Sequence, residues 1–249
     1  MVMKIVDLFA GTGAFSYVLE QSGHECVFAN DMLQSSQSIY NLNHNNDNFV
    51  LGDLNVLHVE EIPSHDILCG GFPCQPFSIA GIKQGFHDPR ANVFWKIIEI
   101  LKHHKPQLFI LENVKNLKTH DNHNTYRIII EHLTNLGYFV KSDIIDTCNI
   151  TQVPQHRERI YIIGFLNKTH HDLFHFDFPS IINLPITSFL QDHVPNKYYY
   201  TNRLKCYDTI KDAVTKHISD NVLYQFRRHY VRENKSQCCP TLTANMGTG

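Results

Sequence analysis

The sequence predicts an α/β protein with a doubly wound, mostly parallel sheet. Apolar, β-branched runs alternate with helical patterns through the first two-thirds of the chain. This alternation is typical of a parallel sheet covered by helices on both faces. Glycines follow the first apolar run directly, where the first strand of such a sheet turns into a helix.

The elements follow from this alternation. The expected strands are rich in Ile, Val, Leu or aromatic residues and cover 4–9, 25–30, 65–69, 107–112, 138–146 and 160–166. The expected helices lie between them, at 14–22, 34–43, 92–104 and 122–136. Gly23 and Gly137 follow the first and the last of these helices, where glycine commonly ends a helix.

The pattern loosens after about Leu166, where segments containing Pro, Asn and His replace the strand–helix units. Short helices are expected there near 186–190 and 205–217. We therefore predict two domains, 1–166 with the sheet and 167–249 beyond it.

Composition narrows the class of protein. Hydrophobic residues make up 43% and charged residues 18%, as in folded proteins. No run approaches the about 18 apolar residues of a membrane span, and no signal-peptide pattern precedes the first strand, so a cytoplasmic protein is expected. The net charge of −2 argues against a uniformly basic coat for nucleic acid, although a local basic face could still bind phosphates.

Cysteines and histidines carry no recognisable pattern. The seven cysteines are scattered without paired spacing, so we expect no disulfide framework. The 17 histidines match neither a zincin nor a zinc-finger pattern, so no metal site is expected.

A glycine turn after the first strand indicates a ligand site. Gly11 and Gly13 suit a dinucleotide, a nucleoside cofactor, or merely close packing of strand and helix. Asp31 follows roughly 20 residues later, where a ribose diol could bind, and Asp53 is a further candidate; loop capping is the alternative for both carboxylates. Ser16 occupies the third glycine position, which favours a cofactor without a diphosphate, such as S-adenosylmethionine.

Cys74 is a candidate nucleophile. It lies between Pro73 and Gln75-Pro76 in a loop after the strand at 65–69, where open α/β sheets place ligands. A lone cysteine is usually a small hydrophobic residue, but this loop offers no strand or helix face in which to bury it. Cys69, within the apolar strand, is expected in the core.

Glu112 is expected at the same edge of the sheet, and two arginines precede a later strand. Glu112 ends an apolar strand and could act in proton transfer, or be a solvated strand end. Arg157 and Arg159 precede the strand at 160–166 on one side of an extended segment. They could hold a phosphate or a base edge, or simply pair with Glu158.

Four motifs together carry a family resemblance. Asp-Leu-Phe-Ala-Gly-x-Gly, Gly-Gly-Phe-Pro-Cys-Gln-Pro-Phe-Ser, Glu-Asn-Val and Gln-His-Arg-Glu-Arg follow one another in this chain. In order and spacing the chain resembles the DNA cytosine-5 methyltransferase family, of the bacterial restriction-modification type, over essentially its whole length. The resemblance implies a Rossmann-like, class I S-adenosylmethionine-dependent fold, with a catalytic domain at 1–166 and part of a target-recognition domain at 167–249.

The resemblance also assigns the cofactor site. S-adenosylmethionine would be bound by eight residues: Phe9, Gly11, Gly13, Asp31, Met32, Asp53, Pro73 and Val93. Phe9 would stack on the adenine, Asp31 would take the ribose hydroxyls and Asp53 the adenine amino group.

The implied chemistry is methylation of a cytosine flipped out of duplex DNA. Cys74 would attack C6, and Glu112 would hold or protonate N3, so that C5 takes the methyl group. Loss of the C5 proton would then release Cys74. Arg159, helped by Arg157, would bind the cytosine carbonyl group.

The DNA contacts implied by the resemblance are basic residues in two parts of the chain: Arg90, Arg227, Arg228, Arg232 and Lys235. A solvated basic run is the alternative for the later ones.

The chain departs from the family pattern at its end. It stops at Gly249, before the family's last motifs, so we expect either a complementary polypeptide that supplies them or an inactive truncated product. An RNA cytosine-5 methyltransferase and a non-catalytic DNA-binding subunit are weaker interpretations of the same motifs. A nicotinamide oxidoreductase is disfavoured by the missing third glycine.

Overall fold

The computed structural model describes residues 1–44, 47–73, 93–179, 181–216, 222–227, 229–234 and 238–242. The chain divides into two compact units. The first comprises Met1–Ile144 and Arg159–Phe176, and the second comprises Ile145–Glu158 and Asp177–Gly249. This division differs from the expected limits at 166 and 167, because 145–158 groups with the later chain and 167–176 groups with the sheet. The role of the second unit in target recognition stays a prediction.

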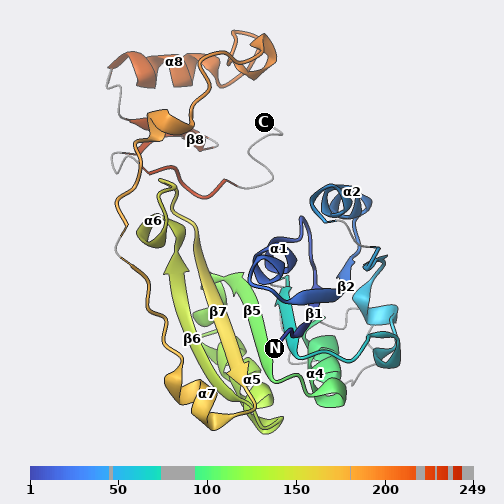
Figure 1. Cartoon of the computed structure of the whole chain (residues 1–249). Coiled ribbons are helices and arrows are strands. Elements are labelled where there is room, and N and C mark those ends of the chain that lie inside the picture. The colour runs from blue at the N-terminus through green and yellow to red at the C-terminus, as the bar shows by residue number, and fades with distance from the viewer. Residues whose placement is uncertain are drawn as a thin grey trace. The chain divides into compact units, whose positions relative to one another are not determined.

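In the described part of the chain, a seven-stranded sheet has the order β3-β2-β1-β4-β5-β7-β6 (Figure 1). The strands are β1 Lys4–Leu8, β2 Glu25–Asp31, β3 Phe49–Leu51, β4 Ile67–Gly71, β5 Leu108–Val114, β6 Phe139–Asp146 and β7 Glu158–Phe165. The pairs from β3 through β5 are parallel, whereas β7 runs antiparallel to β5. The expected doubly wound, mostly parallel sheet is confirmed.

Helices cover both faces of the sheet: α1 Ala14–Gln21, α2 Gln34–Asn43, α4 Val93–His104 and α5 Asn124–Asn135. Successive residues of a strand point to opposite faces, and Val6 of β1 belongs to the buried cluster that also contains the apolar residues of α4 and α5. Ile5 faces the other way, with Phe15 and Leu19 of α1 against it. The expected core position of Cys69 is confirmed, since its side chain is fully buried.

Strands and helices of the first unit follow the sequence pattern closely. All six expected strands are present, and the expected helix at 34–43 has the observed bounds of α2. The sequence pattern does not predict the short strand β3, nor α6 (Thr147–Ile150) and α7 (Lys168–Leu173). Three residues of strand close to a run of asparagines carry too little periodicity to be recognised.

The second unit holds smaller elements. The expected short helices correspond to the 3₁₀ helix η5 (Ile186–Phe189) and to α8 (Tyr207–Lys216). A two-stranded hairpin, β8 (Leu223–Arg227) with β9 (Tyr230–Asn234), is an addition to the expected elements. Across the described residues of the whole chain, no helix has both the length and the apolar character required to cross a lipid bilayer.

Candidate functional site

The candidate site lies along the carboxyl edge of the sheet. Parallel strands β1 to β5 all end at this edge, where open α/β sheets bind their ligands. β7 is antiparallel and therefore begins there, with Arg159 opposite Val114 at the end of β5. Strand direction alone thus brings together residues that are far apart in the sequence.

Glu112 and Arg159 form an ion pair at this edge. The Nε atom of Arg159 lies 2.9 Å from Oε1 of Glu112, and the side chains are 16% and 19% exposed. A charge-assisted contact of this kind fixes the carboxylate in one orientation. The other carboxylate oxygen, Oε2, lies over Gly71, where an added Cβ atom would be only 3.2 Å away.

The segment that leads toward Cys74 is anchored beside Glu112. Gly71, at the end of β4, pairs with Glu112 in register. The next residue, Phe72, is buried, and its carbonyl oxygen accepts a 2.9 Å hydrogen bond from the side chain of Asn113. Pro73 is exposed. Cys74 lies outside the described residues, as does Arg90.

The glycine turn after β1 is held by Asp31. Its Oδ2 atom accepts a hydrogen bond of 3.0 Å from the Gly11 amide, and its Oδ1 atom accepts one of 2.9 Å from the Leu33 amide. Phe9 has a φ of 56°, a conformation uncommon for an aromatic residue. The carboxylate of Asp31 therefore caps this turn, as the loop-capping interpretation expects, and it does so at the edge where a ligand would bind.

Side-chain packing and backbone conformation both require glycine at position 13. Its φ is 83°, and a Cβ atom at this position would overlap Nε2 of His44 and approach the ring of Tyr40. His44 is itself buried and its Nδ1 atom lies 3.0 Å from Glu20. Close packing thus explains Gly13 without a ligand, whereas a Cβ atom at Gly11 would meet only the Phe9 carbonyl oxygen, at 3.9 Å.

The remaining expected cofactor residues that the structure describes differ from one another in exposure. Asp53 is exposed and accepts a 3.0 Å hydrogen bond from the Asn55 amide, which caps the 3₁₀ helix η1 (Leu54–Val56). Met32 is 67% exposed, and Val93 is buried in the main core at the start of α4. Their contact with a cofactor stays a prediction.

A buried carboxylate in β1 is a feature that the sequence pattern did not reveal. Asp7 is fully buried, and its Oδ2 atom accepts hydrogen bonds from the Ser16 amide (3.1 Å) and hydroxyl group (2.6 Å). Burial raises the pKa of the Asp7 carboxyl from 3.8 to about 6, against the lowering effect of the Ser16 hydrogen bonds. The usable signal was a lone Asp in an apolar strand with Ser16 in a glycine position.

Three of the expected basic residues of the second unit are described, and all three are exposed. Arg157 has an exposed side chain, while its amide donates to Asp146 at 3.0 Å. Arg232 is opposite Gln225 in the β8–β9 hairpin, and Arg227 follows Gln225 by two residues. Both arginines therefore project from one face of the hairpin. Arg228 and Lys235 lie outside the described residues.

The sheet, parallel from β3 to β5 and with β7 antiparallel to β5, has the Rossmann-like fold of the class I methyltransferases. Solved structures with the same fold include the S. pombe Dnmt2 methyltransferase, with a TM-score of 0.63, 21% identity, and coverage of 86% of this chain and 66% of that one. Entamoeba histolytica methyltransferase EhMeth matches with a TM-score of 0.65, 18% identity, and coverage of 95% and 80%.

Sequence comparison specifies the family. Residues 3–247 match the family described as C-5 cytosine-specific DNA methylase. Type II methyltransferase M.Bsp6I of Bacillus sp. (strain RFL6) is 41% identical over 253 residues, covering 100% of this chain and 79% of that protein. Type II methyltransferase M.HaeII of Haemophilus aegyptius is 45% identical over 81% of this chain, which spans 62% of that protein. The chain belongs to the C-5 cytosine-specific DNA methylase family, whose chemistry requires a methyl donor.

Proposed function

We propose that the chain is a DNA (cytosine-5-)-methyltransferase that transfers a methyl group from S-adenosylmethionine to C5 of a cytosine within a specific duplex site. The observation that carries the proposal is the Glu112–Arg159 ion pair, held at the carboxyl edge of the sheet beside the anchored start of the Gly-Gly-Phe-Pro-Cys segment. An acid and an arginine at one edge, with a cysteine two residues after the anchored Phe72 in the sequence, suit covalent catalysis on a polar ring.

The residues at the end of β1 and β2 fit a nucleoside cofactor. Phe9 offers a half-buried aromatic ring, Asp31 and Asp53 offer carboxylate oxygens for hydroxyl and amino groups, and a Cβ atom added at Gly52 would meet nothing within 4 Å. The backbone next to Asp53 therefore faces open space. Met32, Pro73 and Val93 complete the proposed set. When bound, S-adenosylmethionine would supply an electrophilic methyl group on a sulfonium sulfur.

Cys74 would provide the covalent step. Its thiolate forms a bond to C6 of the cytosine, and the displaced electron pair makes C5 nucleophilic toward the methyl group. C5 would take the methyl group, and the electron pair of the broken bond would stay with the methyl donor. A base then removes the C5 proton, and the returning electron pair breaks the bond between sulfur and C6, which regenerates Cys74.

Glu112 would act on cytosine N3 during this sequence. Proton donation or a hydrogen bond at N3 draws electron density from the ring and assists attack at C6. Arg159 would keep Glu112 oriented and contact the cytosine carbonyl oxygen, with Arg157 assisting. Because Glu112 and Arg159 come from neighbouring strands rather than loops, their separation is fixed before the base arrives.

The second unit would bind the DNA duplex. Arg227 and Arg232 on one face of the hairpin, together with Arg228 and Lys235, would contact phosphates or bases, and so would Arg90 of the first unit. Methylation of one site would protect that DNA from a cognate restriction enzyme in the cytoplasm, where bacterial DNA lies. The complementary polypeptide expected from the sequence stays a prediction.

Transfer of a labelled methyl group from S-adenosylmethionine to duplex DNA tests the proposal. The wild-type chain and the Cys74→Ser variant are compared, each alone and with the product of any adjacent reading frame that carries the remaining family motifs. Cysteine-dependent labelling of duplex DNA is expected. Cysteine-dependent labelling of RNA but not of DNA would replace the proposed substrate, and no cysteine-dependent transfer in either mixture would reject the catalytic proposal.

A further inference from the structure

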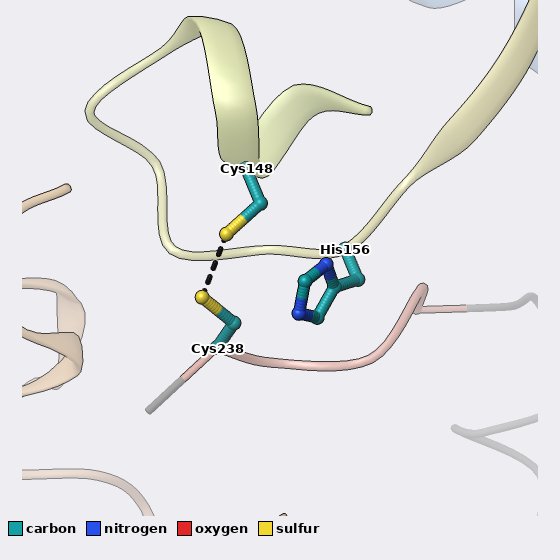
Figure 2. Close-up of side chains that lie close together, drawn as sticks. All are labelled: Cys148, His156 and Cys238. Atoms are coloured by element: carbon teal, nitrogen blue, oxygen red, sulfur yellow. Dashed lines mark hydrogen bonds between the residues drawn. The ribbon is translucent and has the colours of Figure 1, made fainter. Parts of the chain in front are cut away.

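Three side chains of the second unit form a cluster that methyl transfer does not use. The Sγ atoms of Cys148, in α6, and of Cys238 lie 2.7 Å apart. Figure 2 shows the ring of His156 alongside the two sulfurs, and one of its nitrogens and both sulfurs lie within 4.8 Å of one another. Two thiols and an imidazole are the side chains that zinc prefers.

The orientation of His156 favours a ligand role. Its Nδ1 atom lies 2.8 Å from Oδ2 of Asp146, and the Asp146 carboxylate is held in turn by the amides of Arg157 (3.0 Å) and Cys148 (3.2 Å). An imidazole that donates Nδ1–H to a carboxylate keeps its lone pair on Nε2. The same carboxylate–histidine arrangement supports metal-bound histidines in zinc proteins.

The backbone brings the ligand segments together independently of a metal. The amide of Cys239 donates to the Pro154 carbonyl group (2.6 Å), and the amide of His156 donates to the Cys239 carbonyl group (2.8 Å). Asn183 donates from its side chain to the Cys148 carbonyl group at 2.8 Å. Three segments far apart in the sequence therefore converge on one point.

The described residues of the second unit bury few apolar side chains. Apart from Pro154, its buried hydrophobic side chains among the described residues are those of Cys148 and Cys238, with 6% and 8% of their surface exposed. Small units without a sufficient hydrophobic core are commonly held together by a metal or by disulfides. The cluster sits where such a stabilising element is needed.

We propose that Cys148, Cys238 and His156 bind one Zn²⁺ ion that stabilises the second unit, with a water molecule as the fourth ligand. Two thiolates and a neutral imidazole balance the charge of the ion, and binding releases two thiol protons to solvent. The sequence predicts no metal site, because Cys238 lies 90 residues after Cys148 and the three residues follow no Cys-x-x-Cys spacing. Only the fold brings them together.

The two sulfur atoms would have to move only slightly to bind one zinc ion. Tetrahedral zinc with bonds of about 2.3 Å places two sulfurs about 3.8 Å apart, so they would separate by about 1 Å. A disulfide would instead require them to approach to about 2.05 Å. His156 and its Asp146 support decide between the two, since a disulfide has no use for an oriented imidazole.

Metal content of the full chain tests the proposal. The wild-type chain is purified with a phosphine reductant and its zinc is measured by mass spectrometry, then it is stripped with a chelator and titrated with Co²⁺. One metal ion per chain and a thiolate-to-cobalt charge-transfer band are expected. Cys148→Ser, Cys238→Ser and His156→Gln should each lose the band, whereas Cys206→Ser, a half-buried cysteine of the same unit, should keep it.

Two further measurements test the proposal even if a cysteine variant fails to fold. Zinc should raise the unfolding temperature of the stripped wild-type chain but not that of His156→Gln, and Asp146→Asn should weaken Co²⁺ binding about 10-fold to 100-fold. Substoichiometric metal in the wild type, a charge-transfer band that persists in Cys148→Ser, or a Cys148–Cys238 disulfide with no metal uptake would overturn the proposal. None of these readouts depends on methyl transfer.

Discussion

The carboxylate of Glu112 is oriented by one arginine. A single substitution of Glu112 therefore tests its contribution to methyl transfer. Glu112→Gln keeps the shape of the side chain but removes its negative charge and its ability to carry a proton. Methyl transfer is expected to fall about 10²-fold to 10⁴-fold, the usual cost of losing a positioned acid or base. Labelled-methyl transfer under single-turnover conditions measures the chemical step directly.

The exposed pair Arg127–Glu131 of α5 is a matched control. Its atoms are 3.4 Å apart, with side chains 65% and 58% exposed. Glu131→Gln is expected to leave methyl transfer unchanged and to alter the free energy of unfolding by less than about 0.5 kcal/mol. Equal activities of the Glu112→Gln and wild-type proteins would contradict a catalytic role for Glu112.

Gly13 and Gly23 separate backbone strain from steric overlap. Both have a positive φ, 83° and 84°, but a Cβ atom would overlap His44 at Gly13 and meet nothing within 4 Å at Gly23. Gly23→Ala is expected to lower the free energy of unfolding by about 1 kcal/mol through backbone strain. Gly13→Ala should lower it by about 2–4 kcal/mol, because His44 and Tyr40 must also move.

Denaturant unfolding of both glycine variants provides the measurement. Similar losses at the two positions would show that the buried His44 side chain adapts to a methyl group and that the close packing is not restrictive.

Local sequence motifs predict the positions of some candidate residues but not of others. The positions of Glu112 and Arg159 near strand ends could be predicted because each stands beside an apolar run in a distinctive local sequence, whereas their catalytic roles stay predictions. The overlap of Gly13 with His44 could not be predicted, since it depends on how α2 ends against the glycine turn. Asp7 was missed for a related reason: its burial depends on the packing of α1 over β1.

At the scale of elements, Asp7 joins β1 to α1 through Ser16 and makes this contact sensitive to pH. The folded-state pKa, about 6, is above the value of 3.8 expected in the unfolded chain. Its stabilising contribution is therefore fully present below about pH 3.8 and is lost as the pH rises through about 6. From pH 4 to pH 7.5 the wild type should lose on the order of 2 kcal/mol relative to Asp7→Asn.

Urea unfolding of both proteins from pH 4 to pH 7.5 measures this difference. Asp172→Asn is a control of opposite sign, because hydrogen bonds from Lys168 and His171 lower the pKa of its exposed carboxyl group. Parallel pH profiles for the wild type and Asp7→Asn would show that the buried carboxyl group titrates as it does in the unfolded chain.

The elements that could be predicted are those with several turns or strong apolar alternation. α2 matches its expected bounds because its ten residues contain neither Gly nor Pro, although only Tyr40 among them is buried. The β8–β9 hairpin could not be predicted because its strands, Leu-Tyr-Gln-Phe-Arg and Tyr-Val-Arg-Glu-Asn, are short and mostly half-exposed. Pairing between them, rather than either sequence alone, makes them strands.

At the scale of the whole molecule, the hairpin arginines give a prediction about DNA affinity. Arg232→Ala is expected to weaken binding to all duplexes about equally and to reduce the slope of log affinity against log salt by about 1, because one phosphate contact is lost. Fluorescence anisotropy at several salt concentrations measures both quantities. Arg227→Ala with Arg232→Ala should reduce the slope by about 2.

Lys102 supplies the matched control for the hairpin. It is exposed near the end of α4, just before β5 begins, and so lies at the edge of the sheet opposite Glu112. Lys102→Ala should leave the salt slope unchanged. An unchanged slope in Arg232→Ala would remove the hairpin from the DNA interface.

The division of the chain could be anticipated only roughly. A loss of strand–helix alternation after Leu166 marks where the sheet ends, but it cannot show that 145–158 groups with the later chain. Non-local pairing decides this, for example the hydrogen bond from the amide of Cys239 to Pro154. Contacts between segments that are far apart in the sequence produce no periodic pattern from which they could be predicted.

The direction of β7 determines which edge of the sheet Arg159 occupies. β7 has eight residues, so its two ends are separated by about 25 Å. If β7 were parallel to β5, Arg159 would lie at the opposite edge of the sheet, too far away for its side chain to contact Glu112. Glu112 would then have no cation from this strand. One reversed strand therefore allows a protein to assemble a two-strand polar site without an extra loop.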